Sequence, residues 1–263
     1  MEPKLRKLES LIRGLHSAVI AYSGGVDSTL VASVAFEVLG QRAMAVTASS
    51  PIRFASDAAQ AQSLARSIGI RHITIETWEL DDASFVANSP QRCYHCKRML
   101  IRQLRGIAQS DGLAAVVDGS NYDDLQQDRP GRRAAEELGV VSPLAEIGLT
   151  KGDIRAISRC RLLPNWNKPS QSCLATRLPH GTAITVELLQ LVASAEQCLT
   201  GLGLSQYRVR HHGPIARIEL SPEDFRLLAD EAMRLRIVDC LRSIGYSHVT
   251  LDLAGYQTGE KTL

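Results

Sequence analysis

The segment from Ser23 to Ser28, with the sequence SGGVDS, lies between a short apolar run and a helical pattern. Glycine has no Cβ, so the backbone of such a segment can approach an anion closely. The N-terminus of the following helix offers N–H groups and the positive end of the helix dipole. No Gly-Lys-Ser/Thr follows, so the segment is not a Walker loop. It predicts a phosphate-binding loop, with an ordinary strand–helix turn as the alternative, and the expected ligands are Ser23, Gly24, Gly25, Asp27 (through Mg²⁺) and Ser28.

Other segments lie where the rest of a nucleotide is expected. Residues 118–124, DGSNYDD, close a strand pattern, and residues 47–49 lie at the carboxyl end of another. Ligands of open α/β sheets bind at that edge. Carboxylates of the first segment could hold a metal or a ribose, with a solvated acidic turn as the alternative. Lys151 could contact a phosphate or begin a helix. The residues expected to contact the nucleotide are Thr47, Ser49, Gly119, Asn121 and Asp124.

The segment Cys93-Tyr94-His95-Cys96-Lys97 begins a helical pattern. Residues three apart lie on one face of a helix, so Cys93 and Cys96 would present their sulfurs together. The helix N-terminus and Lys97 favour the thiolate form. The pair has three interpretations: a redox couple, half of a zinc site, or part of a [4Fe–4S] cluster with Cys173 as the third ligand.

Two arginines alternate with other residues in the strand pattern Tyr207-Arg208-Val209-Arg210. Successive side chains of a strand point to opposite faces, so Arg208 and Arg210 would share one face. Two guanidinium groups on one face suit a phosphate or a carboxylate, and Arg177 is a third candidate. A solvated sheet face is the alternative.

The elements that must position these residues fall into two groups. Short apolar runs at 17–22, 42–47, 72–77 and 114–118 alternate with helical patterns at 28–39, 56–68 and 91–108. This order predicts an α/β fold with a parallel sheet and helices on both faces. A proline- and asparagine-rich segment follows at 161–169. Beyond it, two helical patterns (184–199 and 222–244) and three strands (207–211, 215–220 and 248–253) predict a separate α+β domain. The predicted domains are residues 1–168 and 169–263.

The first 15 residues are charged and amphipathic, and no apolar run approaches the roughly 20 residues of a membrane span. We therefore expect a cytoplasmic protein without a membrane segment. Thiols stay reduced in that compartment, so we expect no disulfide. Cys160, Cys198 and Cys240 lie among apolar residues, and we predict that they are buried thiols.

The combined motifs resemble a known group of enzymes. Residues 23–28 resemble the SGGxDS signature of the PP-loop ATP pyrophosphatases, which cleave ATP between its α- and β-phosphates. The whole set resembles the LarE-type pyridinium-3,5-bisthiocarboxylic acid mononucleotide synthases over nearly the entire chain. The segments that carry this resemblance are 23–28, 92–97, 173–177 and 207–212.

The resemblance implies a reaction. In that family ATP adenylates a carboxylate of a nicotinate-derived mononucleotide, and sulfur then replaces AMP to give a thiocarboxylate for a nickel-pincer cofactor. One subgroup sacrifices the sulfur of the cysteine that aligns with Cys173. Another holds a [4Fe–4S] cluster on three cysteines, and Cys93 and Cys96 match its additions. The chain resembles this second subgroup, which also suggests a homo-oligomer, with a hexamer as one candidate.

The resemblance also implies roles for individual residues. The expected catalytic residues are Asp27, Lys97 and Cys173. The expected substrate-binding residues are Arg177, Arg208 and Arg210. Glu196 and Glu219 would supply a second metal site or be plain surface carboxylates. ATP, Mg²⁺ and the [4Fe–4S] cluster are the expected cofactors.

The main alternative is a [4Fe–4S]-dependent tRNA thiolase, which would use the same ATP and cluster chemistry on a nucleobase. Such an enzyme needs a basic surface for RNA, and the net charge of +2 argues mildly against one. An amidating synthetase would leave the C-x-x-C pair without a purpose. A nucleotide-binding regulator would leave the arginine pair unexplained as well. We therefore expect a mononucleotide substrate and no nucleic acid.

Overall fold

The computed structural model describes residues 2–126 and 130–257. The chain divides into two compact units. Unit 1 comprises Met1–Ser50, Ala55–Glu79 and Pro90–Lys168, and unit 2 comprises Pro51–Phe54, Leu80–Ser89 and Pro169–Leu263. The domain boundaries 1–168 and 169–263 stay a prediction.

Unit 1 contains a four-stranded parallel sheet with the strand order β3-β2-β1-β4. Its central strands are buried on both faces, which explains why they are continuous apolar runs in the sequence. The observed sheet confirms the prediction of an α/β fold with parallel strands. The strands are β1 (Ala18–Ala21), β2 (Ala43–Ser49), β3 (Arg71–Glu76) and β4 (Ala115–Val117).

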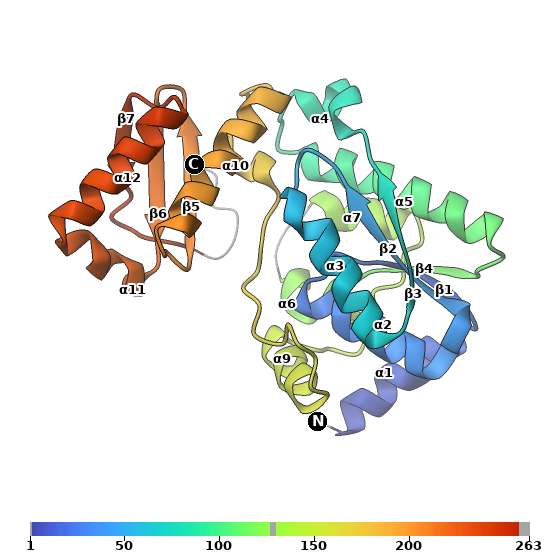
Figure 1. The fold of residues 1–263 in the computed structure, drawn as a ribbon. Helices are drawn as coiled ribbons and strands as arrows, with labels where there is room; N and C mark the ends of the chain where they lie inside the picture. Colours follow the sequence, from blue (N-terminus) through green and yellow to red (C-terminus); the bar gives the residue numbers. More distant parts are fainter. Residues whose placement is uncertain (1, 127–129, 258–263) are drawn as a thin grey trace. The chain divides into compact units, whose positions relative to one another are not determined.

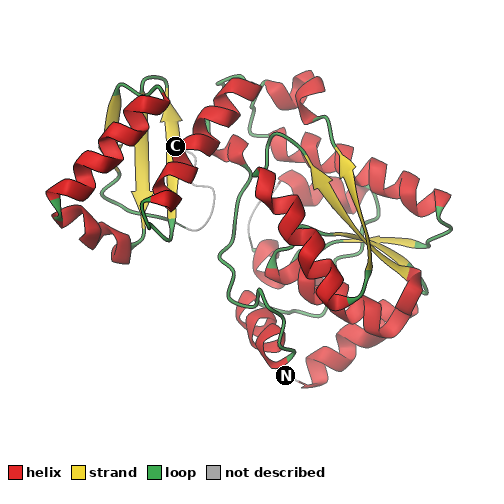
Figure 2. Ribbon diagram, viewed as in Figure 1, coloured by secondary structure: helices red, strands yellow, loops and turns green. Residues whose placement is uncertain are grey.

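Alternate residues of this sheet enter two hydrophobic cores. Ala18 and Ile20 pack with helices α1, α2, α3 and α9, whereas Val19 packs on the other face with helix α5. Helices therefore cover both faces (Figures 1 and 2). The helices of unit 1 are α1 (Glu2–Gly14), α2 (Val26–Leu39), α3 (Ala55–Ile68), α5 (Arg92–Ser110), α6 (Tyr122–Leu125), α7 (Pro130–Glu137), α8 (Pro143–Glu146) and α9 (Lys151–Cys160), with the 3-10 turn η1 (Gly40–Arg42).

Unit 2 has a mixed three-stranded sheet, in which β5 (Tyr207–His212) is antiparallel to β6 (Ile215–Leu220) and β6 is parallel to β7 (His248–Leu251). Helices α10 and α12 supply Leu199 and Leu241 to its core. The helical pattern at 222–244 is interrupted by a 3-10 turn, η4. The remaining elements of unit 2 are α4 (Ala83–Val86), η3 (Leu174–Arg177), α10 (Val186–Gly201), α11 (Pro222–Phe225), η4 (Arg226–Ala229) and α12 (Glu231–Ile244). The 3-10 turn η2 (Glu79–Asp81) begins with the last residue of a unit 1 segment and continues into unit 2.

Two short segments from the first half of the chain belong to unit 2 through hydrogen bonds. Leu174 N donates to Ile52 O over 2.9 Å. The fully buried Asn88 donates its side-chain amide to the carbonyl oxygens of Pro179 and Thr182 over 2.8 and 2.9 Å. These contacts fix residues just after Cys173 within unit 2.

The helices of residues 2–126 and 130–257 include none with the length and apolar character that a membrane span requires.

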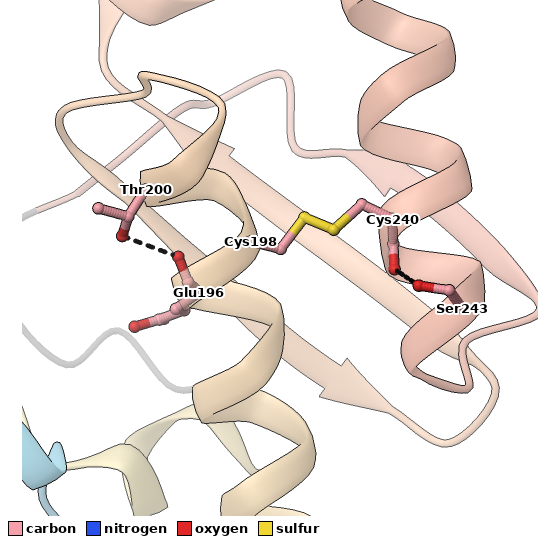
Figure 3. The surroundings of a disulfide bond; sticks show 5 residues. All are labelled: Glu196, Cys198, Thr200, Cys240 and Ser243. Atoms are coloured by element: carbon pink, nitrogen blue, oxygen red, sulfur yellow. Dashed lines mark hydrogen bonds between the residues drawn. A yellow bond between two sulfur atoms is a disulfide. The ribbon is translucent and has the colours of Figure 1, made fainter.

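Cys198 and Cys240 form a disulfide that joins α10 to α12, with their Cα atoms 6.6 Å apart (Figure 3). The prediction that all six cysteines are reduced is therefore wrong for this pair. The prediction rested on the compartment alone, whereas the packing of the two helices brings the sulfurs within bonding distance. Cys160 is exposed, so the prediction that it is buried is wrong too.

The disulfide should stabilise unit 2, because it closes a loop of 42 residues and such a closure contributes up to about 4 kcal/mol. We expect Cys198→Ser to lower the free energy of unfolding by about 2–4 kcal/mol under oxidising conditions. Denaturant unfolding with and without a reducing agent measures this, and Cys160→Ser is the control. Equal stability of the wild type and Cys198→Ser under oxidising conditions would contradict the bond.

Candidate functional site

The parallel strands bring the predicted nucleotide-binding segments of unit 1 to one edge of its sheet. The phosphate loop follows β1, Ser49 ends β2, and residues 118–124 follow β4. All these strands run in the same direction, so their carboxyl ends meet at that edge. Thr47 lies nearby in β2, where its hydroxyl contacts His72 Nε2 at 2.8 Å.

The phosphate loop is preformed by its own hydroxyl groups. The Oγ atoms of Ser23 and Ser28 lie 3.1 Å apart, and Gly25 N donates to Ser23 Oγ over 3.3 Å. Gly24 has a φ of 67°, which glycine adopts without strain. Helix α2 starts at Val26, and its N-cap residue, Gly25, has no side chain to accept the first N–H groups. These N–H groups are therefore available to an anion.

The second nucleotide segment packs directly on this loop. A Cβ at Gly119 would lie 2.8 Å from the backbone nitrogen of Ser28, so only glycine fits there. Just beyond, Asn121 Oδ1 accepts from Asp124 N over 3.2 Å, and Asp124 Oδ2 accepts from Asn121 N over 3.0 Å. This capping box begins α6. The predicted ligands Asn121 and Asp124 thus hold the turn in shape.

Lys151 links the two segments. It is the first residue of α9, and its Nζ donates to both oxygens of Asp27 over 2.6 and 2.7 Å. Its backbone nitrogen donates to Asp123 Oδ2 over 2.8 Å. Burial raises the pKa of Asp27, Lys151 counteracts that rise, and the nearby charge of Asp124 adds to it. Lys151 therefore both begins a helix and places a cation beside the phosphate loop.

A second lysine pairs with a buried carboxylate. Lys97 Nζ donates to Asp118 Oδ2 over 2.8 Å, and Ser142 Oγ donates to Asp118 Oδ1 over the same distance. Burial by itself would raise the pKa of Asp118, but the charge and hydrogen bond of Lys97, with the other donors, lower it below its usual value. The pair ties the start of α5 to the carboxyl end of β4.

The two cysteines of the C-x-x-C pair lie in the first turns of α5 and are half-buried. The side chain of Cys96 donates to Glu79 Oε1 over 3.9 Å. Glu79 is buried, and it also accepts from Ser50 Oγ over 2.6 Å and from Thr77 Oγ1 over 2.9 Å. Sequence reasoning missed Glu79, although an acidic residue shortly after the third strand could have indicated it.

Cys173 lies in unit 2, where it is the N-cap of η3. Its carbonyl oxygen accepts from Thr176 Oγ1 over 2.7 Å and from Arg177 Nη1 over 3.1 Å. Across residues 2–126 and 130–257, no group of three His, Cys, Asp or Glu residues is placed to hold a metal ion. The cluster therefore stays a prediction.

The arginines and glutamates of unit 2 pair with one another. Arg177 forms two hydrogen bonds to Glu196, of 2.8 and 2.9 Å, and Arg210 forms two to Glu219, of 2.9 and 3.3 Å. All four residues are buried. The alternatives of a solvated sheet face and of plain surface carboxylates are thus wrong. Arg208 is buried beside them and interacts with Tyr256.

Asn165, in the proline- and asparagine-rich segment at 161–169, anchors the phosphate loop. Its Nδ2 donates to Gly24 O over 3.0 Å and to Thr29 Oγ1 over 2.9 Å. The side chain is buried. The composition of residues 161–169 did not predict this contact, because Asn165 and its two partners lie more than 130 positions apart in the sequence.

The contact at Gly119 makes a test possible. In Gly119→Ala the new methyl group would lie 2.8 Å from Ser28 N, so the phosphate loop must shift. We expect a loss of about 1–3 kcal/mol of stability and at least roughly tenfold weaker binding of ATP-Mg²⁺ by calorimetry. Gly106→Ala is the control, since a Cβ there meets no atom within 4 Å. Unchanged ATP affinity in Gly119→Ala would contradict the assignment of the loop.

Comparisons with known proteins identify the relatives of this chain. The sequence model of the NAD synthase family matches residues 7–106. An uncharacterized protein of Synechocystis sp. is 46% identical over 260 residues, which cover 99% of this chain and 97% of that protein. An uncharacterized protein of Methanocaldococcus jannaschii is 29% identical over 240 residues, which cover 91% and 90% of the two chains.

A further relative has a named activity. Pyridinium-3,5-bisthiocarboxylic acid mononucleotide synthase of Lactiplantibacillus plantarum is 37% identical over 263 residues, which cover 97% of this chain and 92% of that protein. The match therefore includes the segments of both units described above. The chain belongs to the family of this synthase, as its combined motifs predicted.

Proposed function

We propose that this protein is an ATP-dependent sulfur transferase. It adenylates a carboxylate of pyridinium-3,5-biscarboxylic acid mononucleotide and replaces AMP with sulfur, in the biosynthesis of a nickel-pincer nucleotide cofactor. The observation that carries the proposal is the assembly of the phosphate loop, the Gly119 segment and Lys151 at one edge of the sheet. The similarity to the synthase over both units supports the choice of substrate.

The residues of unit 1 account for the first half of the reaction. The N–H groups at the start of α2 and the hydroxyls of Ser23 and Ser28 bind the phosphates that leave as pyrophosphate. With ATP bound, Lys151 would contact a phosphate oxygen and Asp27 would hold Mg²⁺, which would neutralise charge on the phosphates. A carboxylate oxygen of the substrate attacks the α-phosphorus, and the bond to pyrophosphate breaks. The product is an acyl adenylate with AMP as a good leaving group.

The second half of the reaction transfers sulfur. A sulfide sulfur attacks the acyl carbon, and AMP departs with the oxygen that came from the carboxylate. The arginines of unit 2 bind the anionic groups of the substrate, and Glu196 and Glu219 keep Arg177 and Arg210 oriented. Cys173, whose catalytic role is implied by the family resemblance, lies in the same unit.

We propose Cys93, Cys96 and Cys173 as the ligands of a [4Fe–4S] cluster. The donor set fits, because thiolates are the usual cluster ligands and none of these residues belongs to the disulfide. The cluster would supply an iron without a protein ligand, where sulfide can bind. Lys97, which follows Cys96 on α5, is the proposed cation that favours the thiolate form of the C-x-x-C pair. The homo-oligomer and the cytoplasmic location stay predictions.

The reaction can be tested with purified protein. We expect ATP-Mg²⁺, sulfide and the biscarboxylate mononucleotide to give AMP, pyrophosphate and a thiocarboxylate, which mass spectrometry identifies. Lys151→Ala should slow AMP formation at least tenfold, about 1.4 kcal/mol, because the cation beside the phosphates is lost. Thiolation of tRNA without any product from the mononucleotide would overturn the proposal in favour of a tRNA thiolase.

The cluster can be tested without any activity measurement. After anaerobic purification we expect iron and sulfide in the wild type and a loss of both in Cys93→Ser. Cys160→Ser is the matched control, since that thiol is exposed and lies in the same unit. Equal iron content in Cys93→Ser and the wild type would rule the cluster out. A mass loss of one H₂S after turnover would indicate the sacrifice of Cys173 instead.

A further inference from the structure

The last described segment of unit 2, residues 252–257, lies along strand β6 and is called the C-terminal turn. The N–H groups of Asp252 and Tyr256 donate to carbonyl oxygens of β6 over 2.8 and 2.7 Å. Between them, Gly255 has a φ of 70°, and a Cβ there would lie 3.0 Å from Leu220 O. Glycine is therefore needed for the turn to stay this close to β6, and the backbone fixes where Tyr256 lies.

The C-terminal turn covers Arg208. The guanidinium carbon of Arg208 lies 4.8 Å from the centre of the Tyr256 ring, and Arg208 Nη1 donates to Gln257 O over 3.3 Å. Arg208 is only 6% exposed. Contact with an aromatic ring and one hydrogen bond restrict the guanidinium, and no hydrogen bond to another described residue uses its remaining N–H groups.

Arg208 differs from the arginines beside it in its charge balance. Arg177 and Arg210 are each paired with a buried glutamate. Among the described residues, Arg208 has no carboxylate oxygen within 4.0 Å. Burial lowers the pKa of Arg208, and the charges of Arg177 and Arg210 act in the same direction, whereas Tyr256 and the more distant Glu219 act in the opposite direction. A buried cation without a counter-ion is costly, so this place is complementary to an anion.

We propose that Tyr256 is a positioning residue, which with the Gln257 carbonyl holds Arg208 so that its remaining N–H groups bind an oxyanion of the mononucleotide substrate. The inference rests on the proposed function for the substrate class. The oxyanion is the phosphate ester or a carboxylate of that mononucleotide. The C-terminal turn is then part of the substrate site, although neither Tyr256 nor Gln257 carries a charged side chain.

The test is the binding of nicotinic acid mononucleotide to the full chain by calorimetry. We expect Tyr256→Ala to weaken binding about threefold to thirtyfold, since a cation–aromatic contact of this kind has that effect. Tyr256→Phe keeps the ring and should bind within about twofold of the wild type. Leu253→Ala is the control from the same turn, because Leu253 is 88% exposed. Gly255→Ala should weaken binding like Tyr256→Ala, because it displaces the ring.

Two further probes identify the oxyanion. Nicotinamide mononucleotide lacks the carboxylate, and nicotinic acid riboside lacks the phosphate. If Tyr256→Ala no longer weakens the binding of one of these probes, the group that is missing from that probe is the one that Arg208 binds. In the Arg208→Lys background, Tyr256→Ala should cause no further loss, because Tyr256 acts through the guanidinium.

Two results would overturn the inference. In the first, Tyr256→Ala binds nicotinic acid mononucleotide with wild-type affinity, although Arg208→Lys binds it weakly. In the second, the wild type binds none of the mononucleotide probes. Failure of the proposed function gives a different pattern. The wild type would then bind the probe in a Tyr256-dependent manner but form no AMP from the biscarboxylate substrate.

Discussion

The contact between Gly119 and the backbone of Ser28 is the constraint on which the site of unit 1 depends. A side chain at residue 119 would leave no room for the first turn of α2, so the absence of a Cβ sets how close two loops can be. Once they are this close, Asp118 lies within reach of Lys97 on α5, and Asp123 within reach of the first residue of α9. One backbone approach thereby connects the phosphate loop to the C-x-x-C helix and to Lys151.

Charge pairing is the second theme of both units. Asp27 with Lys151, Asp118 with Lys97, Arg177 with Glu196 and Arg210 with Glu219 are all paired. Buried charges without partners are costly, and pairing holds long side chains in one orientation before any ligand binds. Arg208 departs from this pattern, since an aromatic ring rather than a carboxylate covers it. Arg208 is therefore the one of these three arginines that forms no ion pair with a described carboxylate.

The sequence was informative where local patterns decide the structure. Parallel strands buried on both faces are continuous apolar runs, and the phosphate loop is one contiguous segment, so both could be predicted. The sequence was uninformative where residues far apart in the chain determine the structure through their contacts. Asn165 meets Gly24 across 141 positions, and Asn88 joins unit 2 through contacts with 179 and 182. Helix α7 was missed because only Ala134 and Ala135 face a core, too few for a periodic pattern. The pairing of Arg177 with Glu196 depends on how η3 meets α10, which spacing alone does not fix.

The central claim is that a substrate carboxylate is activated by ATP at the phosphate loop. Its most direct test is isotope transfer from the biscarboxylate mononucleotide labelled with oxygen-18 in its carboxyl groups. During thiocarboxylate formation with ATP-Mg²⁺ and sulfide, we expect one labelled oxygen to appear in AMP, because the attacking carboxylate oxygen leaves with the α-phosphorus. AMP without label, or label in pyrophosphate, would contradict adenylation of the carboxylate.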